Sequence, residues 1–125
     1  MNNCTGLSRL IREMSDGDDE FSVELIAAIY NGLQELKSVY AQGIVEMNET
    51  KIQQIRHKTK PTLVMFEFDD LATTIQEGKE ILENQGFGAA FEAHFLIFQH
   101  KMQLTLDEVG RLADQTKLIL TRPPL

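Results

Sequence analysis

The sequence predicts an all-α fold: an antiparallel up-down four-helix bundle with a short additional N-terminal helix. Apolar residues recur every three or four positions along four long stretches, which is the spacing of one face of an α-helix. The segments between these stretches are short, so we expect consecutive helices to be antiparallel neighbours. No stretch shows the strict alternation of apolar and polar residues that is typical of a half-buried strand.

Length and composition indicate a single domain over residues 1–125, with the bundle itself over about 19–115. Hydrophobic residues make up 42% of the chain and charged residues 25%, which is ordinary for a globular protein. No apolar run approaches the roughly 18 residues of a transmembrane helix, and the first residues lack the regions of a signal peptide. Cys4, the only cysteine, excludes an internal disulfide. We therefore expect a cytoplasmic protein, and a monomer.

The first predicted helix is short and the second is long. Residues 5–14 form an amphipathic segment with Thr5 as candidate N-cap, and the polar residues 15–19 favour a loop. The second helix is expected over 19–46. Its apolar stripe consists of Phe21, Leu25, Ile29, Leu33, Leu36, Tyr40, Ile44 and Met47.

The third helix follows a turn, has Asn48 or Thr50 as its expected N-cap, and runs to about Phe66. Its inward stripe consists of Ile52, Ile55, Thr59, Leu63 and Phe66. Pro61 conflicts with this helix, because its ring removes a backbone donor and clashes with the carbonyl four residues earlier, that of His57. The stripe stays in phase across the proline, so we expect one continuous, kinked helix.

The fourth helix is expected to begin with Asp69 or Asp70 as its cap and to end at Gly86, which suits a left-handed C-terminal cap. Its inward stripe consists of Leu71, Ile75, Gly78 and Leu82. The last helix begins near Gly88, and an extended tail is expected at 122–124. The core positions of this helix are Phe91, Phe95, Phe98, Met102, Thr105, Val109 and Leu112.

His57 lies on the outer face of the third helix. It is two residues past Ile55, about 200° around the helix, so it points away from the inward stripe. Lys60 and Pro61 follow at the third and fourth positions after it, which share its face. The surrounding patch is completed by Gln53, Gln54 and Val64. An outward imidazole with a lysine one turn away suggests phosphate chemistry.

Basic residues are concentrated around this histidine. They are Lys51, Arg56, Lys58 and Lys60, which are 4 of the 12 basic residues of the chain. The window 51–60 contains no acidic residue, although the net charge is −7. A positive island on an acidic protein suits a small anionic group or an acidic pocket on a partner, whereas the negative total argues against nucleic acid. The alternative for any basic run is a solvated helix face, and His57 at the centre favours binding.

The order of helices and the residues His57, Lys60 and Pro61 resemble the histidine-containing phosphotransfer (HPt) domains of bacterial two-component phosphorelays. That family carries a solvent-facing histidine followed by Lys-Gly at the third and fourth positions, on the second long helix of a four-helix bundle. The resemblance covers roughly residues 19–112. The His-x-x-Lys spacing alone is weak, and it gains weight from its position on the outer face of that helix.

The chain departs from the family pattern at three positions. Pro61 stands where glycine is usual, Glu67 replaces a glycine that commonly ends this helix, and Arg56 replaces a small residue before the histidine. A small residue beside the histidine leaves room for an approaching partner. The departures therefore bear on partner choice and transfer rate.

The resemblance implies a phosphorelay. His57 would accept a phosphoryl group from an aspartyl phosphate on one response-regulator receiver domain and pass it to an aspartate on another, while Lys60 offsets charge on the transferring group. It also implies a partner-docking surface formed by Gln53, Gln54, Arg56, Lys58, Pro61 and Val64. The expected partners are receiver domains and a hybrid sensor kinase. No cofactor is expected on this chain, since the magnesium belongs to the receiver. The chain has no nucleotide-binding loop, so we expect no kinase activity.

The other two histidines suggest no chemistry. His94 borders the aromatic stripe of the last helix and is expected to be a partly buried structural residue, whereas His100, two residues past Phe98, points outward. Metal binding is not expected, because the Glu-x-x-His pairs of di-iron bundles are absent and Cys4 with three scattered histidines gives no zinc pattern. No nucleic-acid or membrane partner is expected either.

The main alternative function is that of an adaptor. Such a helical bundle would bind a receiver domain or another signalling partner without carrying phosphate. Pro61, Glu67 and Arg56 keep this alternative open. The loss of His57 distinguishes the two functions, because an adaptor would tolerate it and a relay would not.

Overall fold

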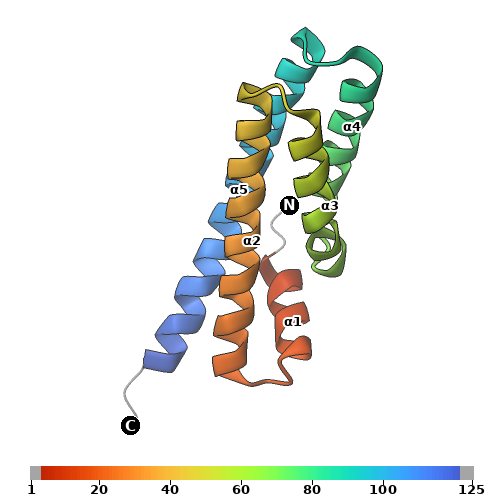
Figure 1. Ribbon diagram of the computed structural model, residues 1–125. Coiled ribbons are helices and arrows are strands. Elements are labelled where there is room, and N and C mark those ends of the chain that lie inside the picture. Colours follow the sequence, from red (N-terminus) through yellow and green to blue (C-terminus); the bar gives the residue numbers. More distant parts are fainter. Residues whose placement is uncertain (1–3, 122–125) are drawn as a thin grey trace.

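The computed structural model describes residues 4–121, and all regular secondary structure in this part of the chain is helical (Figure 1). The helices are α1 (Cys4–Met14), α2 (Asp19–Val45), α3 (Glu49–Met65), α4 (Asp69–Gln85) and α5 (Ala89–Thr121). The predicted all-α class is therefore confirmed for the described residues. The extended tail predicted at 122–124 lies outside them. None of the described helices is long and apolar enough to cross a membrane.

Consecutive helices from α2 to α5 run in alternating directions (Figure 1). Helix α2 packs against α3 and α5, and α4 packs against α5 and α3. Helices α2 and α5 have 27 and 33 residues, whereas α3 and α4 have 17 each. The longer pair extends past the shorter pair, and α1 packs against α2 and α5 in this extended part (Figure 1).

The core is centred on aromatic side chains of α2 and α5. Tyr40, Phe91 and Phe98 are the largest of its fully buried side chains. The ring centroid of Tyr40 lies 4.3 Å from that of Phe98 and 6.2 Å from that of Phe91. On α3 the predicted inward stripe is confirmed. Its buried residues are Ile52, Ile55, Thr59 and Leu63, followed by Phe66 just after the helix.

Side-chain caps fix where α2 and α3 begin. The carboxylate of Asp18 accepts a hydrogen bond from the backbone amide of Phe21 at 3.1 Å. The side-chain oxygen of Asn48 accepts one from the amide of Lys51 at 3.0 Å. Each cap satisfies an amide that has no partner within its helix. Of the two candidate caps for α3, Asn48 is therefore the one used.

The predicted caps of α1 and α4 are wrong. Helix α1 begins at Cys4, so Thr5 lies inside its first turn and not before it. Helix α4 is preceded by Phe68, which makes no side-chain capping bond. Asp69 and Asp70 occupy the first turn of α4 instead. Carboxylates in a first turn interact favourably with the positive end of the helix dipole, so acidic residues there do not identify a cap.

Three helix ends use residues other than glycine in the left-handed region. They are Asp16, Met47 and Glu67, with φ of 53°, 51° and 57°. At the end of α2 the amide of Asn48 donates to the carbonyl of Gly43 at 2.8 Å, the six-residue closure of a Schellman turn. Glu67 likewise ends α3 in a left-handed conformation that glycine adopts at lower cost. Helix α4 ends at Gly86 as predicted and the φ of this glycine is positive at 71°, but its ψ of −165° differs from that of the predicted left-handed cap.

The predicted stripe of α2 is wrong at both ends. Phe21 and Met47 were expected in the core but are 45% and 66% exposed, whereas Ser22 and Ile26 are buried. A stripe that steps by four residues at every turn rotates about 40° per step, so Phe21 lies about 80° from the direction of Ile29. Met47 lies beyond the end of the helix.

The last helix differs from its prediction in a similar way. Leu106 is the buried residue where Thr105 was expected, and Thr105 is half-buried. Its hydroxyl donates to the carbonyl of Lys101 at 2.9 Å, so this polar group is satisfied on the side of the helix. Helix α5 also continues to Thr121, beyond the expected end of the bundle near residue 115.

Candidate functional site

The outer face of α3 exposes the residues that the sequence places there. His57, Lys60 and Pro61 are all exposed, as are Gln53, Gln54 and Val64, the last at 62%. The cap at Asn48 and the buried stripe on the opposite side fix the rotation of the helix. An exposed imidazole with a lysine one turn away offers a nucleophile beside a cation. These groups suit the transfer of an anionic phosphoryl group.

Pro61 lies inside α3 without interrupting it. The helix is continuous from Glu49 to Met65, as expected from the phase of the stripe. The proline has no N–H, so the carbonyl oxygen of His57 receives no bond from the position that would normally supply one. The proline ring is exposed and takes no part in the core.

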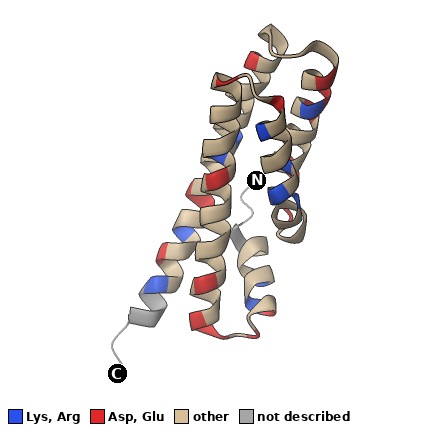
Figure 2. Ribbon diagram, viewed as in Figure 1, with Lys and Arg blue, Asp and Glu red and all other residues tan. Residues whose placement is uncertain are grey.

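Two of the four basic residues in the positive island are paired with acidic side chains in the structure. The ammonium of Lys58 lies 2.9 Å from a carboxylate oxygen of Glu35, and that of Lys51 lies 2.9 Å from Glu46. Figure 2 shows acidic positions of α2 next to the basic residues of α3. Exposed ion pairs contribute little to stability, about 0–1 kcal/mol each, but each lowers the net charge presented to a partner. Lys60 makes no such pair with any residue that the structure describes.

Arg56 is the one predicted docking residue that is not fully exposed. It is half-buried, about 100° around the helix from His57. Its guanidinium charge acts on the phenol of Tyr40 in the core: burial raises the pKa of Tyr40, and Arg56 offsets part of that rise. Arg56 therefore serves the interior as well as the surface, and the basic patch beside His57 depends mainly on Lys60.

A hydrogen-bonded pair that sequence reasoning missed lies in the core. The hydroxyl of Tyr40 is 2.7 Å from Nε2 of His94, and either tautomer of a neutral imidazole can make this bond. His94 is buried, as predicted. Burial lowers the pKa of His94, and the carboxylate of Glu77 offsets part of that change. The buried pair is closed off from the α3 face, whereas His100 is exposed as predicted.

Gly78 allows this pair to form. A β-carbon at position 78 would come within 2.7 Å of the Tyr40 hydroxyl and still closer to the imidazole of His94. The signal available in the sequence was a tyrosine on one predicted apolar stripe and a histidine bordering another, together with a glycine on the inward face of the fourth helix. The polar atom of a tyrosine or histidine side chain that is buried in a core requires a hydrogen-bond partner.

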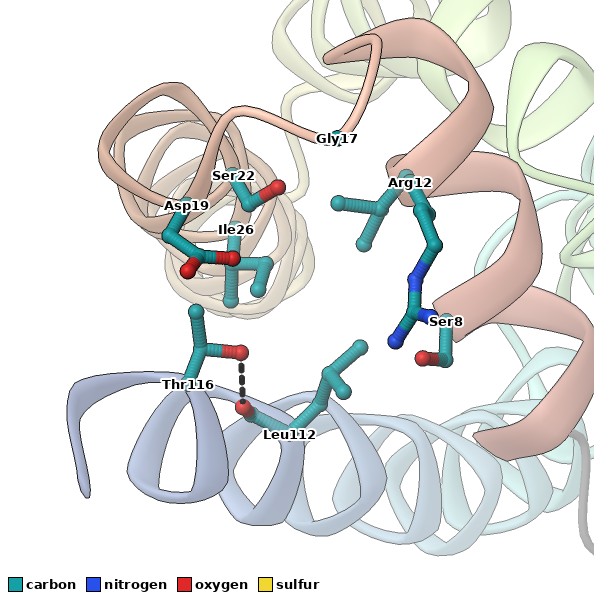
Figure 3. Close-up of a pocket in the computed structure, with 9 residues that line it drawn as sticks. Ser8, Arg12, Gly17, Asp19, Ser22, Ile26, Leu112 and Thr116 are labelled. Carbon is teal, nitrogen blue, oxygen red and sulfur yellow. Dashed lines mark hydrogen bonds between the residues drawn. The ribbon is translucent and has the colours of Figure 1, made fainter. Parts of the chain in front are cut away.

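A separate cavity of about 280 Å³ lies between α1, α2 and α5 (Figure 3). Arg12 and Asp19 lie on opposite sides of it. The hydroxyl of Ser22 also lines the cavity, but it is already hydrogen-bonded to Ser15 at 2.7 Å. Thr116 similarly donates to the carbonyl of Leu112. The cavity shares no lining residue with the outer face of α3.

Within residues 4–121, no three histidine, cysteine, aspartate or glutamate side chains come close enough to hold a metal ion. No protein-family model matches the chain, and searches of curated proteins and of solved structures likewise find no match.

Proposed function

We propose that this chain is an HPt-type carrier that relays a phosphoryl group between aspartates of receiver domains through His57. The observation that carries the proposal is the exposed imidazole of His57 on the outer face of α3, with Lys60 exposed one turn further along. We further propose that α2 to α5 form an antiparallel up-down four-helix bundle and that α1 is its N-terminal addition. The protein would act in the cytoplasm as a monomer.

The transfer needs little from this chain. A neutral ring nitrogen of His57 attacks the phosphorus of an aspartyl phosphate, and the bond between phosphorus and the carboxylate oxygen breaks. The aspartate leaves with that electron pair, and the proton on the other ring nitrogen can pass to water because the ring is exposed. The reverse sequence delivers the phosphoryl group to a second aspartate.

Lys60 supports this step by its position. One turn after the histidine, its ammonium can approach the oxygens of the transferring group, where negative charge is concentrated. Catalysis of phosphoryl transfer consists largely of positioning and of such charge stabilisation. The metal ion and the carboxylates that bind it would belong to the receiver partner, so the carrier itself needs no cofactor.

Docking would use the α3 face around the histidine. Gln53, Gln54, Pro61 and Val64 are exposed there and offer uncharged contacts. Lys58 is also exposed but is paired with Glu35 of α2, so an acidic receiver would compete for a lysine that already has a partner. The partners we propose are receiver domains and a hybrid sensor kinase.

The test is phosphoryl transfer from a receiver domain labelled with radioactive phosphate. Wild type is compared with His57→Gln, and His100→Gln is the matched control because it removes another exposed histidine. We expect an acid-labile, base-stable label on wild type and on His100→Gln, and none on His57→Gln. A label that survives in His57→Gln would assign the reaction to another residue.

The same experiment separates the relay from the adaptor. Receiver binding is measured in parallel for wild type and His57→Gln. Binding by both proteins without a label on either, across several receivers, would overturn the relay and favour an adaptor that carries no phosphate.

A further inference from the structure

A groove of about 480 Å³ runs between α4 and α5. Its apolar lining consists of Ile81 of α4 with Ala90, Ala93 and Ile97 of α5, and Asn84, Gln85 and the buried His94 line it as well. Glu77 and Glu80 of α4 form an acidic rim. Helix α3 contributes no lining residue, so this surface is separate from the face that carries His57.

The α5 side of the groove has the pattern of a helix that packs against another helix. Ala90, Ala93 and Ile97 follow one another by three and four residues, so they lie on one face. The alanines have short side chains and leave a depression. Ile97 borders this depression and is 52% exposed. Leu104, seven residues further, continues the face and is 55% exposed. Large apolar side chains exposed at helical spacing are typical of a surface that an amphipathic helix covers.

The charge around the groove indicates what kind of helix fits. Helix α4 carries five acidic residues and one lysine, and of the described residues that line the groove none is Lys or Arg. A second copy of this chain would bring its own acidic rim and its share of a net charge of −7 against the first. A partner with positive charges beside an apolar stripe would meet complementary charge instead.

We propose that the groove between α4 and α5 binds a basic amphipathic helix of a partner protein. Large apolar side chains of that helix would fill the depression over Ala90 and Ala93, and its Lys or Arg side chains would lie against Glu77 and Glu80. Because α3 takes no part, the groove and the face of His57 can be occupied at the same time. The proposal does not depend on phosphoryl transfer.

The probe is a synthetic peptide of about 18 residues, roughly five helical turns, with leucine along one face and lysine elsewhere. A second peptide carries glutamate in place of every lysine. Both are labelled with fluorescein, and binding to the full chain is measured by fluorescence anisotropy. We expect the lysine peptide to bind at least about tenfold more tightly than the glutamate peptide, a difference of about 1.4 kcal/mol.

Two variants with matched controls locate the binding. Ala93→Arg places a long cation among the apolar residues that line the groove, and Ala28→Arg makes the same change at an exposed position of α2. The double variant Glu77→Gln and Glu80→Gln removes the rim charge, with Glu20→Gln and Glu24→Gln as the control on α2. We expect Ala93→Arg and the rim variant to weaken binding of the lysine peptide about tenfold, and the α2 controls to change it less than about twofold.

Several results would overturn the proposal. Equal losses in Ala93→Arg and Ala28→Arg would reduce the binding to general attraction between opposite charges. No binding of the lysine peptide at about 100 µM, where an interaction worth about 5.5 kcal/mol would be half saturated, would also contradict it. Sedimentation that shows a dimer of wild type, lost in Ala93→Arg, would assign the groove to a second copy of the chain.

Discussion

The hydroxyl of Tyr40 and Nε2 of His94 lie 2.7 Å apart, and this hydrogen bond joins α2 to α5 across the core. Helix α4 passes directly beside it at Gly78. One polar contact thus involves three helices. Because it is buried, loss of either partner would leave a polar atom unpaired in the interior, at a cost of about 1–3 kcal/mol.

Gly78→Ala should therefore destabilise the protein, even though alanine favours helix by about 1 kcal/mol. The added methyl group would collide with His94 and with the Tyr40 hydroxyl, and overpacking of this kind typically costs about 1–3 kcal/mol. Chemical denaturation measures the change. Gly32→Ala is the matched control, because a β-carbon there meets nothing within 4 Å. It should leave stability unchanged or increase it by up to about 1 kcal/mol. Equal effects at both positions would contradict the steric argument.

Stability should fall as the pH is lowered below the ordinary histidine value of 6.5, in part because of His94. Its pKa is lowered in the folded protein by burial, so below 6.5 the unfolded chain binds a proton that the folded chain does not. The loss begins near pH 6.5 and grows toward the folded pKa. Between pH 7.5 and 5.5, His94→Gln should lose less unfolding free energy than wild type, by up to about 1.4 kcal/mol. His100→Gln is the control from the same helix. A His94→Gln profile parallel to that of wild type would contradict this assignment.

Glu67→Gly should stabilise the protein. Glu67 has φ of 57° at the end of α3, a conformation that costs a residue with a β-carbon about 1–2 kcal/mol. Glycine removes that cost but loses more freedom on folding, so we expect a gain of about 1 kcal/mol in unfolding free energy. The converse change, Gly86→Ala at φ of 71°, should destabilise. If both variants lose stability, the Glu67 side chain contributes more than its backbone strain costs.

Lys60→Ala should slow phosphoryl transfer to His57 by about tenfold, less than the loss of a donor in a closed active site because water screens an exposed ammonium. The measurement is the rate at which the label moves from a receiver domain. Lys58→Ala is the matched control, since Lys58 is exposed on the same helix but is paired with Glu35. Equal slowing by the two variants would mean that the general positive charge of α3 matters and the position of Lys60 does not.

The helices of this protein and the orientation of His57 could be predicted from the sequence, because both follow from periodicity. Once one residue of a helix is known to face the core, the direction of every other side chain follows from its distance in sequence. The burial of Ile55 and the exposure of His57 therefore follow from the same periodicity. The predicted side-chain direction was wrong where the apolar stripe rotated around a long helix, as at Phe21. The predicted cap of α4 was wrong because acidic residues are favourable both at a cap and in the first turn of a helix.

Contacts between helices could not be predicted in the same way. The window 51–60 around His57 contains no acidic residue, yet Glu35 of α2 and Glu46, which directly follows α2, neutralise two of its lysines. The bond between Tyr40 and His94 joins residues 54 positions apart. Such pairings depend on which helices become neighbours and on their relative position along the bundle axis. The apolar stripe of a single helix contains neither piece of information.

The separation of Tyr40 and His94 also has a consequence for how the chain folds. Helices α2, α3 and α4 each pack against the next helix in sequence, so these contacts can form early, whereas α5 must find α2 across the two helices between them. Closing the longer loop costs more entropy, and contacts between distant residues slow folding. We therefore expect the docking of α5 to be the rate-limiting step. Until α5 docks onto α2, the apolar faces that these two helices bury against each other remain uncovered, and a chain arrested at that point is prone to aggregate.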